Sequence, residues 1–168
     1  MLRTTVVLMA LTPVLAPAAP PSKDVTPAPV PAQIGAARKV FIANGGMEYN
    51  PNGQKLGVYG GGPDRSYDQF YAAMKSWGRY ELAGSPGDAD LVLEISFSNP
   101  TVSWAGLFTD PQLRLVIADP RTRVPLWTFI RHLEIAGRQE NRDKNFDKAM
   151  DDIVASLKNL DARAAAQK

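Results

Sequence analysis

Residues 90–98 carry an apolar side chain at every second position, and this pattern constrains the fold more than any other feature of the chain. Successive side chains of a β-strand point to opposite faces of a sheet, so the spacing predicts a strand with one buried and one solvated face. Such a strand needs a packing layer on one side only. The expected inner face consists of Leu91, Leu93, Ile95 and Phe97, and the expected outer face of Glu94, Ser96 and Ser98.

Two segments with helical spacing of apolar residues supply that packing layer. The first covers residues 66–77 and ends at Gly78, and the second covers residues 143–161. Further strands are predicted at 38–43, 80–83, 113–118 and 126–135. We therefore expect an α+β fold, a two-layer sandwich in which two amphipathic helices cover one face of a largely antiparallel four- to five-stranded sheet.

The N-terminus has the order of a secretory signal peptide. Arg3 precedes an apolar run at 4–16, and small residues follow at 16–18. The run is shorter than the roughly 20 residues of a membrane-spanning helix, so we expect cleavage after Ala18 and a periplasmic or secreted protein. The Pro- and Ala-rich segment that follows predicts an extended linker. The expected organisation is a signal peptide at 1–18, a linker at 19–37, one domain at 38–162 and a disordered tail at 163–168.

The chain contains no cysteine and one histidine. The lack of cysteine excludes disulfides and thiolate ligands, and it predicts that no lipid is attached to a cysteine behind the signal. With so few nitrogen and sulfur ligands we expect no metal site, and we assign no cofactor. The net charge is +2 and the basic residues are scattered among acids, so we expect no nucleic-acid partner.

Two blocks in the middle of the chain form a recurring pattern. The first is Ala-Asp-Leu-Val-Leu-Glu at 89–94, and the second is Leu-Arg-Leu-Val-Ile-Ala-Asp at 113–119, followed by Thr122 and Leu126-Trp127. Over about residues 38–160 the chain resembles small exported bacterial envelope domains of unknown function. These include lipoprotein-like families and domains similar to the N-terminal part of TolB-like proteins. The resemblance implies an α+β envelope protein that binds or scaffolds other components, and it transfers no catalytic residue.

The loop at 99–111 is the strongest candidate for a contact site. Trp104, Leu107 and Phe108 surround Gly106 between two predicted strands. Clustered apolar side chains on a surface loop are typical of binding sites. We expect these three residues to bind an envelope protein partner, or to touch a membrane surface without spanning it. The alternative is that the loop folds back onto the core. Our first interpretation is a non-enzymatic exported binding or scaffold domain.

The alternative function is small-molecule binding or hydrolysis on the outer sheet face, beneath the Gly-rich loop at 44–64. Its candidate ligand-binding residues are Glu94, Arg114, His132 and Glu134. A histidine base needs a nucleophile and an orienting acid, and no spacing in the chain identifies them, so no catalytic residue is assigned. Cross-strand ion pairing is the simpler interpretation of these charges. The oligomeric state stays open, since an exposed edge strand at 38–43 would also permit self-association.

Overall fold

The computed structural model describes residues 27–47, 59–100 and 109–167. In chain order the elements are α1 (Ala32–Ala36), β1 (Lys39–Met47), α2 (Arg65–Trp77), β2 (Glu81–Leu82), the 3-10 turn η1 (Pro86–Asp88), β3 (Leu91–Ser98), β4 (Gln112–Ala118), β5 (Pro125–His132) and α3 (Gln139–Ala166).

The five strands form one mixed sheet in the order β2-β1-β3-β4-β5. β1 runs parallel to β2 and β3, whereas the β3–β4 and β4–β5 pairings are antiparallel. The parallel β1–β3 pairing requires a crossover connection, which α2 provides. Most paired residues lie in the two antiparallel ladders, so the predicted α+β fold with a largely antiparallel sheet is confirmed.

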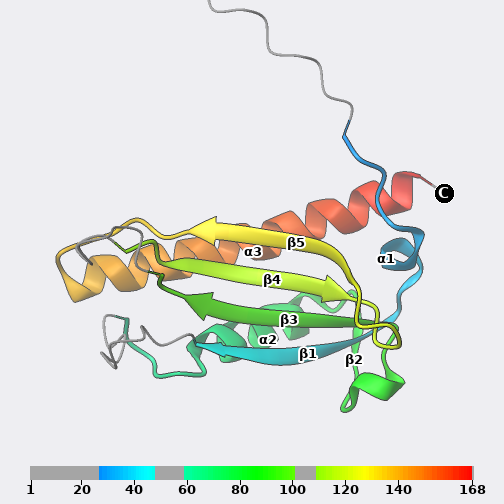
Figure 1. Cartoon of the computed structure of the whole chain (residues 1–168), viewed down its shortest axis with the longest axis horizontal. Helices are drawn as coiled ribbons and strands as arrows, with labels where there is room; N and C mark the ends of the chain where they lie inside the picture. The colour runs from blue at the N-terminus through cyan, green and yellow to red at the C-terminus, as the bar shows by residue number, and fades with distance from the viewer. Residues whose placement is uncertain (1–26, 48–58, 101–108, 168) are drawn as a thin grey trace, which may run out of the picture.

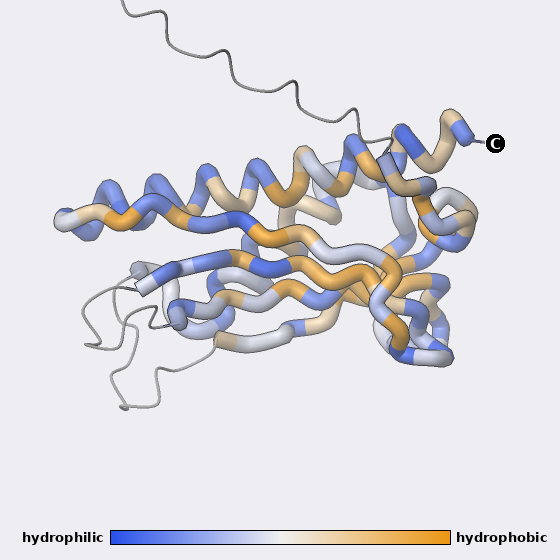
Figure 2. The backbone as a smooth tube through the Cα atoms, turned by 45° about the horizontal axis from the view of Figure 1, so that its top comes forward, coloured by the Kyte–Doolittle hydropathy of each residue, from blue (hydrophilic) through white to orange (hydrophobic). Residues whose placement is uncertain are grey.

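Both long helices pack on the same face of the sheet. α2 contacts β1 and β3, and α3 contacts β4 and β5. No described helix lies against the other face, which is turned toward the viewer in Figure 1. Hydrophobic and hydrophilic residues alternate along α3 in Figure 2, as expected for a helix with one buried side. The core between the layers contains the fully buried Phe70, Phe97 and Phe146, together with the inner-face residues of β3 and β4.

The predicted end of the first long helix is confirmed. Gly78 caps α2 in the left-handed conformation, with φ of 66°, and its N–H donates to Met74 O. A side chain at this φ would be strained, so glycine favours the end of the helix here. Phe70 and Met74 then lie on the buried side of α2.

The predicted boundary between linker and domain at residue 38 is wrong. Val30, Ile34 and Ala37 are buried in the core, and α1 packs against α3. A Cβ on Gly35 would lie only 3.1 Å from the Ala164 Cβ, so the glycine permits this close approach. The Pro- and Ala-rich composition indicated an extended segment, but short apolar residues at helical spacing are enough to dock it.

The predicted bounds of the last two elements also need correction. β5 ends at His132, and Ile135, expected on its inner face, is 68% exposed. α3 begins four residues earlier than predicted and extends into the expected disordered tail as far as Ala166. Within that extension, Ala164 is buried against Gly35 of the α1 segment. The expected signal peptide lies outside the described residues.

Candidate functional site

The predicted aromatic contact loop falls largely outside the described residues. Trp104, Leu107 and Phe108 lie in that part, so their exposure stays a prediction. The structure does describe both ends of the loop. Asp110 N donates to Pro100 O over 3.0 Å, which brings the exit from β3 and the entry to β4 together.

Glu94 and Arg114 lie on the open face of the sheet, as predicted. Glu94 on β3 stands opposite Val116, and Arg114 on β4 stands opposite Ser96, so the two charged residues are diagonal neighbours. Both are exposed, and the described residues contain no ion pair between them. The expected cross-strand ion pair is therefore absent from the described structure.

His132 and Glu134 come together at a different place. They line a small cavity of about 50 Å³ with Asn145, Lys148, Ala149 and Asp152 of α3, at the edge of the sheet. His132 Nδ1 lies 2.7 Å from Asp110 Oδ1. Glu134 follows the end of β5, where its backbone oxygen accepts a hydrogen bond from Asn145. The four predicted ligand-binding residues therefore divide between two places, since neither Glu94 nor Arg114 lines this small cavity.

The described end of the Gly-rich loop lies on the helix side of the sheet and forms no roof over the outer face. Tyr59 is buried in ring contacts with Phe97 and Phe146. Gly60 N donates to Asp143 Oδ1 over 2.8 Å, so this backbone N–H is already paired with a carboxylate of the protein. Residues 48–58 lie outside the described part of the chain.

One half of the open sheet face is apolar. Phe41, Val92 and Ala118 form a row across β1, β3 and β4, since Phe41 pairs with Val92 and Val92 pairs with Ala118. Val116 lies beside this row, and Ile130 on β5 is 42% exposed opposite Arg114. Toward the end of β3, from which the loop at 99–111 departs, the paired residues are polar or charged: Ser96 with Arg114, and Ser98 with Gln112.

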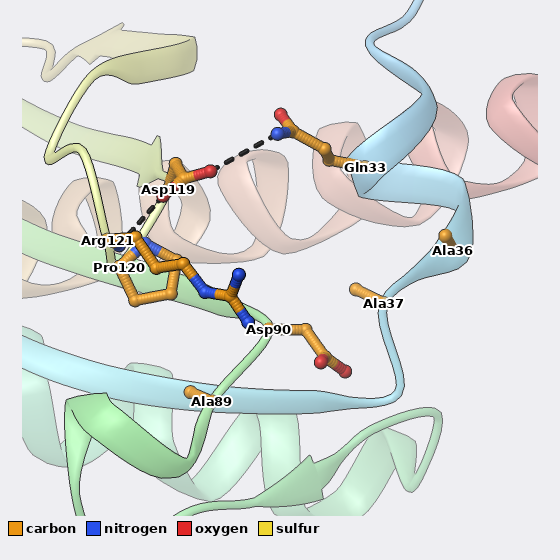
Figure 3. A pocket seen from close by; sticks show the side chains of 8 residues that line it. All are labelled: Gln33, Ala36, Ala37, Ala89, Asp90, Asp119, Pro120 and Arg121. Atoms are coloured by element: carbon orange, nitrogen blue, oxygen red, sulfur yellow. Dashed lines mark hydrogen bonds between the residues drawn. The ribbon is translucent and has the colours of Figure 1, made fainter.

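The larger cavity was not predicted from the sequence. It has a volume of about 280 Å³ and lies where α1, the start of β3 and the β4–β5 turn meet (Figure 3). Its walls consist of Gln33, Ala36, Ala37, Ala89, Asp90, Asp119, Pro120 and Arg121. In the sequence, an aspartate stands next to each of two strands that border this cavity, Asp90 before β3 and Asp119 after β4. The cavity could not be inferred from them, because Gln33 was expected to belong to the linker.

Both carboxylates of this larger cavity are anionic. Hydrogen bonds from the Arg38 and Lys39 N–H groups to Asp90 Oδ2, at 2.8 and 2.9 Å, lower the pKa of Asp90. The Thr122 and Arg121 N–H groups likewise lower the pKa of Asp119. A carboxylate that accepts backbone hydrogen bonds favours its charged form, so these groups are poor proton donors.

The described residues contain no helix long and apolar enough to cross a membrane. Within the same residues, no three acidic, histidine or cysteine side chains gather where a metal ion would bind. The candidate sites are thus the open sheet face and the cavity between α1 and the β4–β5 turn.

No protein-family model matches the chain, and neither does any curated protein. A solved structure of a Xanthomonas campestris protein of family DUF330 shares 13% identity at a TM-score of 0.44, covering 83% of this chain and 92% of that one. A Helicobacter pylori protein described as a neuraminyllactose-binding hemagglutinin homologue also gives 13% and 0.44, over 74% and 86% of the two chains. Uncharacterized lipoprotein B of Nitrosomonas europaea gives 13% and 0.38, over 84% and 93%. These similarities assign neither a family nor an activity.

Proposed function

We propose that this protein is a non-catalytic binding or scaffold domain of the bacterial cell envelope, which contacts a protein partner through the loop at 99–111 and the adjoining sheet face. The observation that carries the proposal is the face of the sheet against which no described helix packs. A sheet with helices on one side only leaves its second face available for a partner. On that face lie the apolar row of Phe41, Val92 and Ala118 and the exposed Ile130.

The position of the loop supports its role as an anchor. The Asp110–Pro100 hydrogen bond holds its two ends at the edge of the open face. A large aromatic side chain on such a loop reaches a partner that also covers the neighbouring strands, and buried aromatics carry much of the binding energy of an interface. Trp104 and Phe108 are the proposed anchors, with Leu107 between them.

The described polar groups favour binding over catalysis. His132 pairs with Asp110, but Glu94 and Arg114 lie apart from this pair and from Glu134. A general base acts on a nucleophile within hydrogen-bond reach and is held by an orienting group. The described residues supply one orienting carboxylate for His132 and no nucleophile beside it.

Export through the signal at 1–18 and the likeness to the N-terminal part of TolB-like proteins stay predictions. Sequencing the N-terminus of the protein recovered from the envelope tests the first, and the expected first residue is Ala19. A start at Met1 would contradict cleavage.

Site-specific photo-crosslinking in cells tests the contact surface. We place the crosslinker at Trp104, at Ile130 on the open face, and at Tyr71, which is 39% exposed on α2, as the control. The proposal expects one dominant envelope protein at the first two positions and none at the control. Adducts with lipid alone would overturn it in favour of a membrane-surface role. A folded protein without adducts at 104 and 130 would also overturn it.

A further inference from the structure

We propose that the cavity between α1 and the β4–β5 turn binds a small zwitterionic amino-carboxylate, such as a free amino acid or a short peptide. The carboxylate of the ligand pairs with Arg121 and its ammonium group with Asp90. This site is separate from the proposed partner surface, which lies on the open sheet face, and does not depend on it.

The charged groups of the cavity are partly satisfied by the protein and partly free. Asp90 accepts both backbone hydrogen bonds through Oδ2, and its Oδ1 has no hydrogen-bond partner among the described residues. Asp119 uses Oδ1 for the Arg121 and Thr122 N–H groups and Oδ2 for Gln33 Nε2 at 3.2 Å. The cavity therefore offers one free carboxylate oxygen, on Asp90.

Arg121 supplies the complementary donor. Figure 3 shows its side chain reaching across the cavity toward Asp90. No ion pair or hydrogen bond joins its guanidinium to another side chain in the described part of the chain. A guanidinium binds a carboxylate through two parallel N–H donors, which makes it well suited to this ligand group.

The turn that carries Arg121 is rigidly held. Asp119 O accepts from Arg123 N over 2.9 Å, and Asp119 N donates to Val124 O over 3.1 Å. Arg123 adopts a φ of 59°, a backbone conformation that residues other than glycine seldom take. The backbone that carries Arg121 is thus fixed before a ligand arrives, so only the arginine side chain itself has to be ordered on binding.

Charge and size select the ligand class. A simple anion would face the carboxylates of Asp90 and Asp119, and a simple cation would face Arg121, whereas a zwitterion matches one charge of each sign. The volume of about 280 Å³ lies just below the usual range for drug-sized ligands. The methyl groups of Ala36, Ala37 and Ala89 leave the space open, because longer side chains at these positions would occupy it.

Titration of the 15N-labelled chain, monitored by NMR, tests the site with three matched probes. L-alanine carries both charges, propionate lacks the ammonium group, and ethylamine lacks the carboxylate. We expect saturable shifts of the amides of Ala36, Ala37, Ala89 and Arg121 with L-alanine. Propionate and ethylamine are expected to bind about tenfold more weakly or worse, since each loses one charge-assisted contact.

Two variants and a control make the test specific. Arg121→Gln removes the guanidinium and is expected to weaken L-alanine binding about tenfold or more. Ala36→Leu is expected to block the cavity. Arg138→Gln removes an exposed arginine at the start of α3 and is expected to change nothing. Failure of both L-alanine and L-alanyl-L-alanine to give a saturable shift overturns the proposal. Equal responses to all three probes, or undiminished binding by Arg121→Gln, also overturn it.

Discussion

The Arg65 guanidinium donates a hydrogen bond to Asp143 Oδ1 over 2.6 Å, although the two residues lie 78 positions apart. The same guanidinium donates to Gly60 O and to Asp147, and it lies 4.3 Å above the centre of the Phe146 ring. One side chain thus connects the start of α2, the end of the Gly-rich loop and the first turns of α3.

Replacing this arginine is expected to destabilise the fold strongly. The Arg65 side chain is 10% exposed, so Arg65→Met leaves the Asp143 carboxylate with fewer partners in a partly buried site. We expect the free energy of unfolding to fall by about 2–3 kcal/mol, measured by urea denaturation. The control Lys144→Met breaks an exposed pair with Glu140 and is expected to cost less than about 0.5 kcal/mol. Equal losses in the two variants would contradict this role for Arg65.

The docking of the N-terminal segment predicts a large effect from a single residue of α1. Ile34 is fully buried, so Ile34→Ala is expected to lower the free energy of unfolding by about 2–4 kcal/mol. Its exposed neighbour serves as the control, and Gln33→Ala is expected to change stability by less than about 0.5 kcal/mol. If residues 19–37 were a free linker, neither substitution would have an effect.

Stability at acid pH is expected to depend on Asp90. Backbone hydrogen bonds from Arg38 and Lys39 hold its pKa below the ordinary value of 3.8. The unfolded chain therefore takes up a proton at a higher pH than the folded one, and the contribution of Asp90 is lost as pH falls through the folded pKa. We expect Asp90→Asn to lose less stability than the parent between about pH 5 and pH 2, measured by thermal unfolding. An identical acid profile in the variant would refute this assignment.

Stability at alkaline pH is expected to depend on Tyr80. Burial, followed by the nearby Asp161 carboxylate, raises the pKa of Tyr80 well above its ordinary value of 10.0. Above pH 10 the unfolded chain releases this proton while the folded chain keeps it, so stability falls as pH rises. Tyr80→Phe is expected to cost about 1 kcal/mol at neutral pH, through the lost hydrogen bond to Asp161, and to flatten the alkaline decline. Burial also raises the pKa of Tyr59, so part of the decline persists. Denaturation curves at neutral and alkaline pH check both effects, and an unchanged alkaline slope would count against the role of Tyr80.

The elements predicted best were those whose own residues determine them. The spacing of Leu91, Leu93, Ile95 and Phe97 predicted the buried face of β3 correctly, since all four side chains are buried. Gly78 marked the end of α2 because a left-handed residue is a local requirement. Both signals depend on a few neighbouring residues and not on distant parts of the chain.

The features that were missed depend on distant contacts. Composition could not show that Ile34 would be buried in the core, or that Gly35 would meet Ala164. Likewise, the spacing predicted β5 to continue through Ile135, whereas the chain leaves the sheet after His132. The larger cavity could not be predicted from the sequence, because Gln33, Asp90 and Arg121 come from three separate segments that only the folded chain brings together.

The bond from Val30 N to Gln167 Oε1 places the two ends of the described chain at the same pole of the molecule. The C-terminal end of α3 marks this pole in Figure 1, while β3 and β4 meet the loop at 99–111 at the opposite pole. A tether or fusion partner joined to either end of the described chain is therefore attached at the same pole. Pro100 and Asp110 then lie on the side of the domain that faces away from the attachment point.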